Sequence, residues 1–318
     1  MCRLSFFCLV VAACEFAGPQ QPPPQQPQPP LCKPGFGYIF ASSSDLATPM
    51  VAGGASANIA ACIDPGLPDI AKVYVSSPAV ATIDRPTLSG NFVTFGIVSG
   101  VAGDTDLALL DAAGNQLART TLHVADATEL AVDRGWGTDP APTLLDGGVS
   151  VLHVTTRRGA DTLVGVGAVH YAFAGGVESA TYDDALSGSE GDAVYFRAHA
   201  GGGTITASCP SASVQVPIAV VEPSALTEVR ASTSSLHIAA GGEGTVYVGA
   251  FAGATPVYDV RCYWFSQPWR LAAEPDRVSS RGLGGEAGYW YRITGPQGSY
   301  TLTCMVPGGS TTLSVTID

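Results

Sequence analysis

Charged residues are scarce in this chain of 318 residues. They make up 13% of it, and basic residues number only 15 against 27 acidic ones. The net charge of −12 disfavours a nucleic-acid partner, because binding to a polyanion needs basic surface that displaces counterions. Methionine is rare, and long helix-forming runs are few. The apolar residues come instead in short stretches, separated by many of the 38 glycines and 23 prolines. This pattern predicts an all-β protein built of short strands.

The motifs of catalysis and cofactor binding are missing as well. The sequence has no Gly-x-Ser-x-Gly nucleophile elbow, no phosphate-binding loop and no dinucleotide-binding glycine motif that follows a strand. The histidines lack the His-Glu-x-x-His spacing of a zinc site, and no pair of cysteines has the Cys-x-x-Cys spacing. Glycine-rich spots such as residues 201–203 are interpreted as hairpin turns. We therefore expect a protein that is not an enzyme and that takes no metal and no cofactor.

The amino terminus has the character of an export signal. Arg3 precedes an apolar run that ends at Ala13, which is too short to cross a bilayer as a helix of about 20 residues. The run closes with Val11-Ala12-Ala13-Cys14, which resembles the lipobox of bacterial lipoproteins. The resemblance implies that residues 1–13 are a cleaved signal peptide and that Cys14 is lipidated, so that the membrane is a partner. The alternative is an ordinary signal with an incidental cysteine. The absence of Asp after Cys14 favours the outer membrane.

A tether follows the cysteine, over residues 14–34. Residues 19–30 are all Pro or Gln, a composition that adopts extended polyproline II structure with a rise of about 3.1 Å per residue. We interpret this segment as a stiff spacer that holds the folded part away from the membrane. A proline-rich ligand for a partner domain is the alternative interpretation.

Three copies of one unit make up the rest of the chain. A Gly-Gly pair precedes an alternating segment in each third, and the first glycines of these pairs are Gly53, Gly147 and Gly241, spaced 94 residues apart both times. Alternating segments about one period apart close the units, at residues 119–124, 213–218 and 312–317. The repeat predicts three domains, over residues 35–127, 128–223 and 224–318.

The first unit carries a family resemblance. Residues 75–84 read VSSPAVATID and residues 100–108 read GVAGDTDLA, which are similar to two segments of bacterial immunoglobulin-like domains of group 2. The other two units lack these segments but share the period. The resemblance and the unit length together imply three tandem immunoglobulin-like β-sandwiches.

Cys2 and Cys8 fall in the predicted signal peptide and Cys14 is the predicted lipidation site, which leaves five of the eight cysteines. Export makes disulfides plausible among these five. Cys32 and Cys62 both fall in or next to the first unit and are one expected pair. Cys262 and Cys304 are the other, and strand alternation places them between the sheets of the third unit beside Trp264. Cys209 is expected to be a buried free thiol. A reactive or metal-binding pair of Cys209 with His170 is the alternative.

The third unit is also the best candidate for a binding site. It holds Trp269, Trp290, Tyr289 and Arg270, which are residue types enriched at interface hot spots, and the segment 265–270 has the composition of a loop. We predict a non-enzymatic surface protein for adhesion or recognition, with a glycan or a protein as partner. The second hypothesis is a spacer or assembly subunit without a ligand, and the third is an enzyme or metal-dependent binder on a sandwich scaffold.

Overall fold

The computed structural model describes residues 35–38, 46–133, 141–180, 192–275 and 288–318. These residues form strands and one short 3-10 helix, Pro223–Ala225, which confirms the all-β prediction. None of the helices in this part of the chain is long and apolar enough to cross a membrane. The signal peptide, Cys14, the tether and Cys32 lie outside the described residues, so their roles stay predictions.

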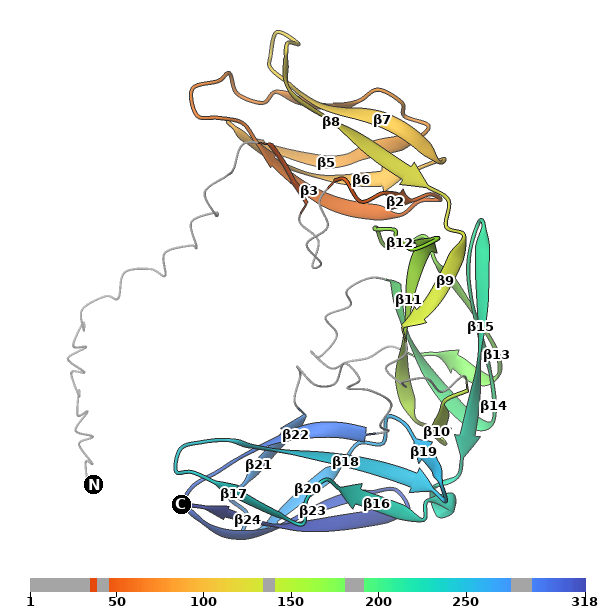
Figure 1. Cartoon of the computed structure of the whole chain (residues 1–318), viewed down its shortest axis with the longest axis vertical. Helices are drawn as coiled ribbons and strands as arrows, with labels where there is room; N and C mark the ends of the chain where they lie inside the picture. Colours follow the sequence, from red (N-terminus) through yellow and green to blue (C-terminus); the bar gives the residue numbers. More distant parts are fainter. Residues whose placement is uncertain (1–34, 39–45, 134–140, 181–191, 276–287) are drawn as a thin grey trace, which may run out of the picture. The chain divides into compact units, whose positions relative to one another are not determined.

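The first sandwich consists of β1 to β8. One sheet has the order β1-β3-β6-β5 and the other the order β2-β8-β7-β4 (Figure 1). Alternation along β6 shows why the sheets face each other, since every second residue from Val93 to Ser99 is buried and the residues between are half-exposed. The strands are β1 Gly35–Tyr38, β2 Met50–Val51, β3 Ser56–Cys62, β4 Lys72–Val75, β5 Ala81–Ser89, β6 Phe92–Ser99, β7 Gly103–Leu110 and β8 Gln116–Ala125.

The second sandwich depends on one long strand. The first part of β14 pairs with β11, and the part from Gly203 to Cys209 pairs with β15, so that β14 joins both halves of the sandwich. Its three central glycines, residues 201–203, are therefore not the hairpin turn that the sequence suggested. They lie within the strand, where it passes from one half to the other. The strands are β9 Glu129–Asp133, β10 Thr143–Leu145, β11 Val149–Arg158, β12 Asp161–Thr162, β13 His170–Ser179, β14 Asp192–Cys209 and β15 Ala212–Val221.

The third sandwich repeats the arrangement of the first. One sheet has the order β16-β18-β22-β21, with β19 paired to β18, and the other has the order β17-β24-β23-β20. Buried side chains from both sheets, such as Val246 and Leu302, form its core. The strands are β16 Glu228–Ala231, β17 Ser235–Ile238, β18 Gly244–Ala252, β19 Thr255–Val257, β20 Tyr263–Gln267, β21 Ala272–Pro275, β22 Gly288–Thr294, β23 Gly298–Val306 and β24 Gly309–Ile317.

A shared topology explains the sequence repeat. In each sandwich a short early strand pairs in parallel with the last strand, as β2 with β8, β10 with β15 and β17 with β24. The repeated glycines follow these short strands, and Gly53, Gly147 and Gly241 all have positive φ, at +99°, +76° and +72°. The repeated closing segments form the last strands. This topology confirms three immunoglobulin-like sandwiches.

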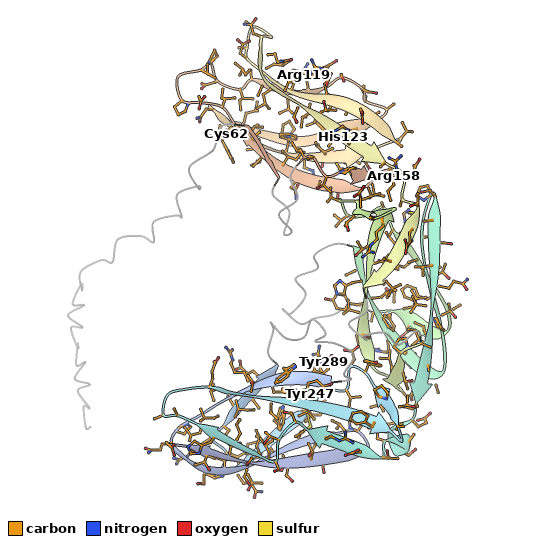
Figure 2. All side chains as sticks on the ribbon, in the orientation of Figure 1. Cys62, Arg119, His123, Arg158, Tyr247 and Tyr289 are labelled. Carbon is orange, nitrogen blue, oxygen red and sulfur yellow. A yellow bond between two sulfur atoms is a disulfide. The ribbon has the colours of Figure 1, made fainter. Side chains whose placement is uncertain are left out.

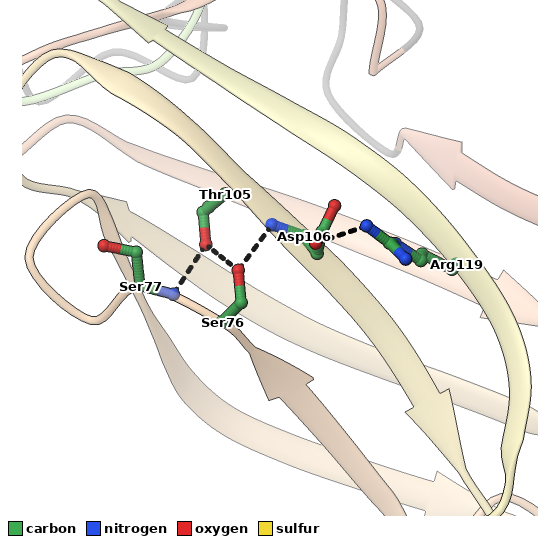
Figure 3. A network of polar contacts seen from close by, with 5 residues as sticks. All are labelled: Ser76, Ser77, Thr105, Asp106 and Arg119. Carbon is green, nitrogen blue, oxygen red and sulfur yellow. Dashed lines mark hydrogen bonds and ion pairs between the residues drawn. The ribbon is translucent and has the colours of Figure 1, made fainter.

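The residues that carry the family resemblance form one hydrogen-bond network in the first sandwich (Figure 3). The Ser77 N–H donates to Thr105 Oγ1 at 2.9 Å, and the Ser76 hydroxyl lies 3.2 Å from the same oxygen. The Asp106 N–H donates to Ser76 Oγ, also at 2.9 Å. A Cβ on Gly100 would lie 2.1 Å from the carbonyl oxygen of Ala79, so glycine is required there. These residues therefore connect β4, β7 and the loop that follows β4.

The structure contains the disulfide between Cys262 and Cys304. Trp264 lies directly opposite Cys304 on the neighbouring strand. This bond was expected between the two sheets, but β20 and β23 are neighbours within one sheet. Cys262 ends the segment that crosses from the other sheet, so the bond fixes this crossing to β23.

The remaining cysteines differ in environment. Cys62 is buried (labelled in Figure 2), and its expected partner Cys32 is not among the described residues. Cys209 is a half-buried free thiol. His170 does not form a site with it, because His170 pairs with Ser208, and successive residues of a strand face opposite sides.

Candidate binding surface

The structure does not bring the four predicted binding residues together. Trp269 is 74% exposed and lies beside exposed Arg270 in the turn after β20. Trp290 is half-buried in the opposite sheet, where its ring lies 5.6 Å from that of Tyr247. Tyr289 packs against the core from the same strand, β22. These residues therefore do not form one continuous surface, because they lie on different elements and faces of the sandwich, and their role in binding stays a prediction.

Tyr289 has a structural role. Its hydroxyl donates a hydrogen bond of 2.6 Å to Asp259 Oδ1, and the Arg261 guanidinium lies 5.6 Å from its ring centre (Figure 2 labels Tyr289). Burial raises the pKa of Tyr289 well above its ordinary value, and the neighbouring Asp259 carboxylate raises it further. Both contacts hold the segment that leads to β20, so Tyr289 supports the position of that strand.

An exposed apolar surface lies on β20 and its neighbour β23. We call it the β20 surface and define it as Tyr263, Phe265, Trp269, Arg270 and Met305. The exposed fractions of its four apolar side chains are 70% for Tyr263, 39% for Phe265, 74% for Trp269 and 47% for Met305. They are half of the eight large apolar side chains that are exposed among the described residues. Such a concentration is typical of an interaction site.

Strand alternation and ring packing order this surface. Tyr263 and Phe265 point outward from β20, while the hydroxyl-bearing Ser266 is buried on the inward face. Tyr263 lies opposite Met305 across the strand pair. The rings of Phe265 and Trp269 meet edge to face, with centres 5.5 Å apart. The aromatic side chains therefore support one another although they are exposed.

Ser266 fixes the turn that carries Trp269. Its hydroxyl donates to the Pro268 carbonyl oxygen at 2.9 Å. The same oxygen accepts hydrogen bonds from the N–H groups of Arg270 and Leu271, at 3.2 and 3.3 Å. One buried side chain thus satisfies three backbone groups of the turn, which holds Trp269 next to Phe265.

The surface offers apolar side chains, hydroxyl groups and one positive charge. Arg270 is its one charged group and makes no ion pair with any described residue. Threonine and serine side chains extend the outer face along β23 and β24, where Thr303 pairs with Thr312 and Thr301 with Ser314. Within the described ranges, no three His, Cys, Asp or Glu side chains gather as a metal site would need. The surface can stack, form hydrogen bonds and hold one anionic group.

Residues 265–270 were interpreted as a loop, so Phe265 was not predicted as an outward-facing strand residue, and Met305 on β23 was not predicted as a surface residue. The structure corrects this interpretation, since β20 continues to Gln267 and the turn begins at Pro268. The alternation of Tyr263, Phe265 and Gln267 was the signal that could have identified the outward face.

Comparison with known proteins shows no family for this chain. No family model matches the sequence, and no curated protein does. Similar solved structures include domains 4–9 of the surface layer protein SbsC, with 16% identity over 80% of this chain and a TM-score of 0.31. The Escherichia coli adhesin FdeC has 13% sequence identity over 85% of this chain and a TM-score of 0.24. The titin fragment I67–I69 has 9% sequence identity over 90% of this chain and a TM-score of 0.21. This chain spans 40% of the SbsC fragment, 94% of the FdeC chain and 99% of the titin fragment. These likenesses are too distant to bear on function.

Proposed function

We propose that this protein is a non-enzymatic, lipid-anchored surface protein of bacteria whose third sandwich recognises a partner. The observation that carries the proposal is the β20 surface, where Tyr263, Phe265, Trp269 and Met305 are exposed together. Trp, Tyr, Phe, Met and Arg are the residue types enriched in the cores of protein interfaces. Monomeric proteins rarely expose a cluster of large apolar side chains, and where they do the cluster marks an interaction site.

The distribution of charge supports the same assignment. Residues 35–223 contain 7 basic and 19 acidic residues, a net charge of −12, whereas residues 224–318 contain 6 basic and 7 acidic residues, a net charge of −1. The first two sandwiches are thus well solvated and repel other acidic surfaces. The third sandwich, which lacks this repulsion, is the part suited to close contact.

The test is attachment of the full-length protein, displayed on cells or on beads, to envelope material or host surfaces. Trp269→Ala removes the most exposed aromatic side chain of the surface and should weaken attachment by about tenfold or more. Tyr74→Ala is the matched control, since Tyr74 is an exposed aromatic residue on β4 of the first sandwich and should have no effect. Equal attachment of both variants and the parent would refute the proposal.

A structural spacer without a ligand is the second candidate. The Pro/Gln tether and the three repeated sandwiches favour it, because both features add length. It predicts that Trp269→Ala changes neither attachment nor the organisation of the envelope.

A further inference from the structure

The edge strands of the sheets differ in how they are protected against the addition of another strand. An edge strand presents unpaired backbone N–H and C=O groups to which another strand can add, and proteins protect such edges with charge, proline or bulges. The described residues form four edge strands of five or more residues, β5, β9, β13 and β20. They offer an internal comparison of how each edge is protected.

Three of these strands carry protection. In β5, Asp84 and Arg85 come with a register shift between Asp84 and Thr87. In β13 there is a register shift after Gly175, and Glu178 adds a charge. In β9 the protecting charge is that of Glu129, the first residue of the strand. All three edges therefore resist the addition of a further strand.

Strand β20 has none of these devices. Its sequence, YWFSQ, contains no charge and no proline, and its pairing with β23 is regular from Tyr263 to Gln267. No strand of the described residues pairs with its other edge. The equivalent strand of the first sandwich, β4, shows the contrast, because there Lys72 lies over the ring of Tyr74 at 5.7 Å. The edge of β20 is also the edge beside which the aromatic side chains are exposed.

We propose that β20 binds an extended segment of another polypeptide, which adds to the sheet β17-β24-β23-β20 as a further strand. Backbone hydrogen bonds to the free edge give affinity, and side chains at alternate positions of the added strand pack against Tyr263 and Phe265. The inference rests on the proposed function and names its partner class.

Arg270 defines the charge of the partner. It is exposed, it lacks an ion pair among the described residues, and it follows β20 directly in the turn that Ser266 fixes. We therefore expect the partner segment to carry a carboxylate at the end nearest Arg270, where the carboxylate and the guanidinium can form a charge-assisted pair. The partner segment has alternating apolar side chains and an acidic end.

A second copy of this chain fits less well. An antiparallel pair of two β20 strands centred on Phe265 would place Arg270 of each copy opposite Val260 of the other, next to Arg261. Like charges would then meet at both ends of the pair. The two acidic sandwiches of each copy would add repulsion at longer range.

The test uses the full-length protein and a synthetic peptide that alternates valine and threonine and ends in aspartate. Two further peptides carry N-methyl groups on one or the other set of alternate residues, which leaves the side chains unchanged. Because alternate N–H groups of a strand point to opposite sides, one methylation pattern should weaken binding by about tenfold or more and the other should not. Phe265→Lys should weaken binding of the unmethylated peptide similarly. Tyr74→Lys on β4, at a similarly exposed aromatic residue, should leave it unchanged.

Each other result overturns the inference. Absence of peptide binding at millimolar concentration overturns it, and so does equal binding of both methylated peptides.

Concentration-dependent dimers of the parent, lost in Phe265→Lys, would assign the edge to a second copy. Binding of a neutral polysaccharide that depends on Trp269, without peptide binding, would assign the surface to a glycan and leave the recognition role intact. Thermal melting of each variant shows that it is folded. If Trp269→Ala leaves cell attachment unchanged, the proposed function itself fails.

Discussion

At the scale of single residues, two tyrosines of β22 connect the interior of the third sandwich to the segment that positions β20. The Tyr291 hydroxyl accepts the Cys262 N–H at 2.8 Å, next to the disulfide, and the Trp264 ring meets the Tyr291 ring edge to face at 5.1 Å. Tyr289 holds Asp259 on the same segment. The position of the exposed aromatic residues thus depends on buried hydroxyl groups from a strand of the other sheet.

These tyrosines make the third sandwich sensitive to alkali. Burial raises the pKa of Tyr291 from 10.0 to about 12, and the hydrogen bond from the Cys262 N–H and the charge of Arg261 oppose this shift only partly. Since the folded state holds this proton more tightly than the unfolded state, the stabilisation is complete below pH 10 and is lost as the pH rises through about 12. The expected loss is about 3 kcal/mol for Tyr291. Tyrosinate absorbance and urea denaturation across this range measure it.

The control for the alkaline effect is Tyr291→Phe, which keeps the ring and removes the titrating hydroxyl. It should be less stable than the parent at neutral pH, since the Cys262 N–H loses its acceptor, and should show a weaker fall in stability above pH 10. A fall as steep as that of the parent would contradict the assignment to Tyr291.

At the scale of elements, the passage of β14 between the two halves of the second sandwich depends on glycine. A Cβ on Gly203 would lie 2.1 Å from the Ala174 carbonyl oxygen, whereas one on Gly201 would meet nothing within 4 Å. The strands are therefore in backbone contact at Gly203, and the position has no room for any side chain.

Replacing each of these two glycines by alanine measures two different contributions to the free energy of unfolding. At Gly203 the contribution is steric overlap, and at Gly201 it is backbone strain. Gly203→Ala should destabilise the protein by about 3 kcal/mol or more, because the contact is with backbone that cannot move aside. Gly201→Ala should cost only about 1–2 kcal/mol, the strain of its φ of +91° in a residue with a side chain. Urea denaturation measures both. Equal midpoints for the two variants would show that the passage of β14 is not tightly packed.

The elements also show what the sequence could predict. Period and alternation predicted the sandwiches, since the turn glycines and the last strands recur with nearly constant spacing. They could not predict that β14 serves both halves of its sandwich, because a long strand and a hairpin with a glycine turn have the same local pattern. Nor could they predict that Trp269, in the turn after β20, and Trp290, on β22 of the other sheet, lie apart, because that depends on long-range strand pairing.

At the scale of the whole molecule, the lipid anchor remains a prediction from residues 11–14. Cys14→Ser should release the protein from membranes into the soluble fraction, because a lipidated cysteine is the only membrane anchor that the sequence analysis identified. Fractionation with an antibody detects the change, and Cys209→Ser serves as the control that should stay with the membrane. Continued membrane association of Cys14→Ser would refute lipidation.

The parallel pairing of early and last strands also has a mechanical consequence. When a sandwich is pulled by its two ends, parallel strands at those ends slide past each other, so their hydrogen bonds bear the load together and do not open one at a time. The paired residues number two for β2 with β8, three for β10 with β15 and four for β17 with β24. A chain pulled by its two ends would therefore have its most extensive parallel pairing in the third sandwich and its least extensive in the first.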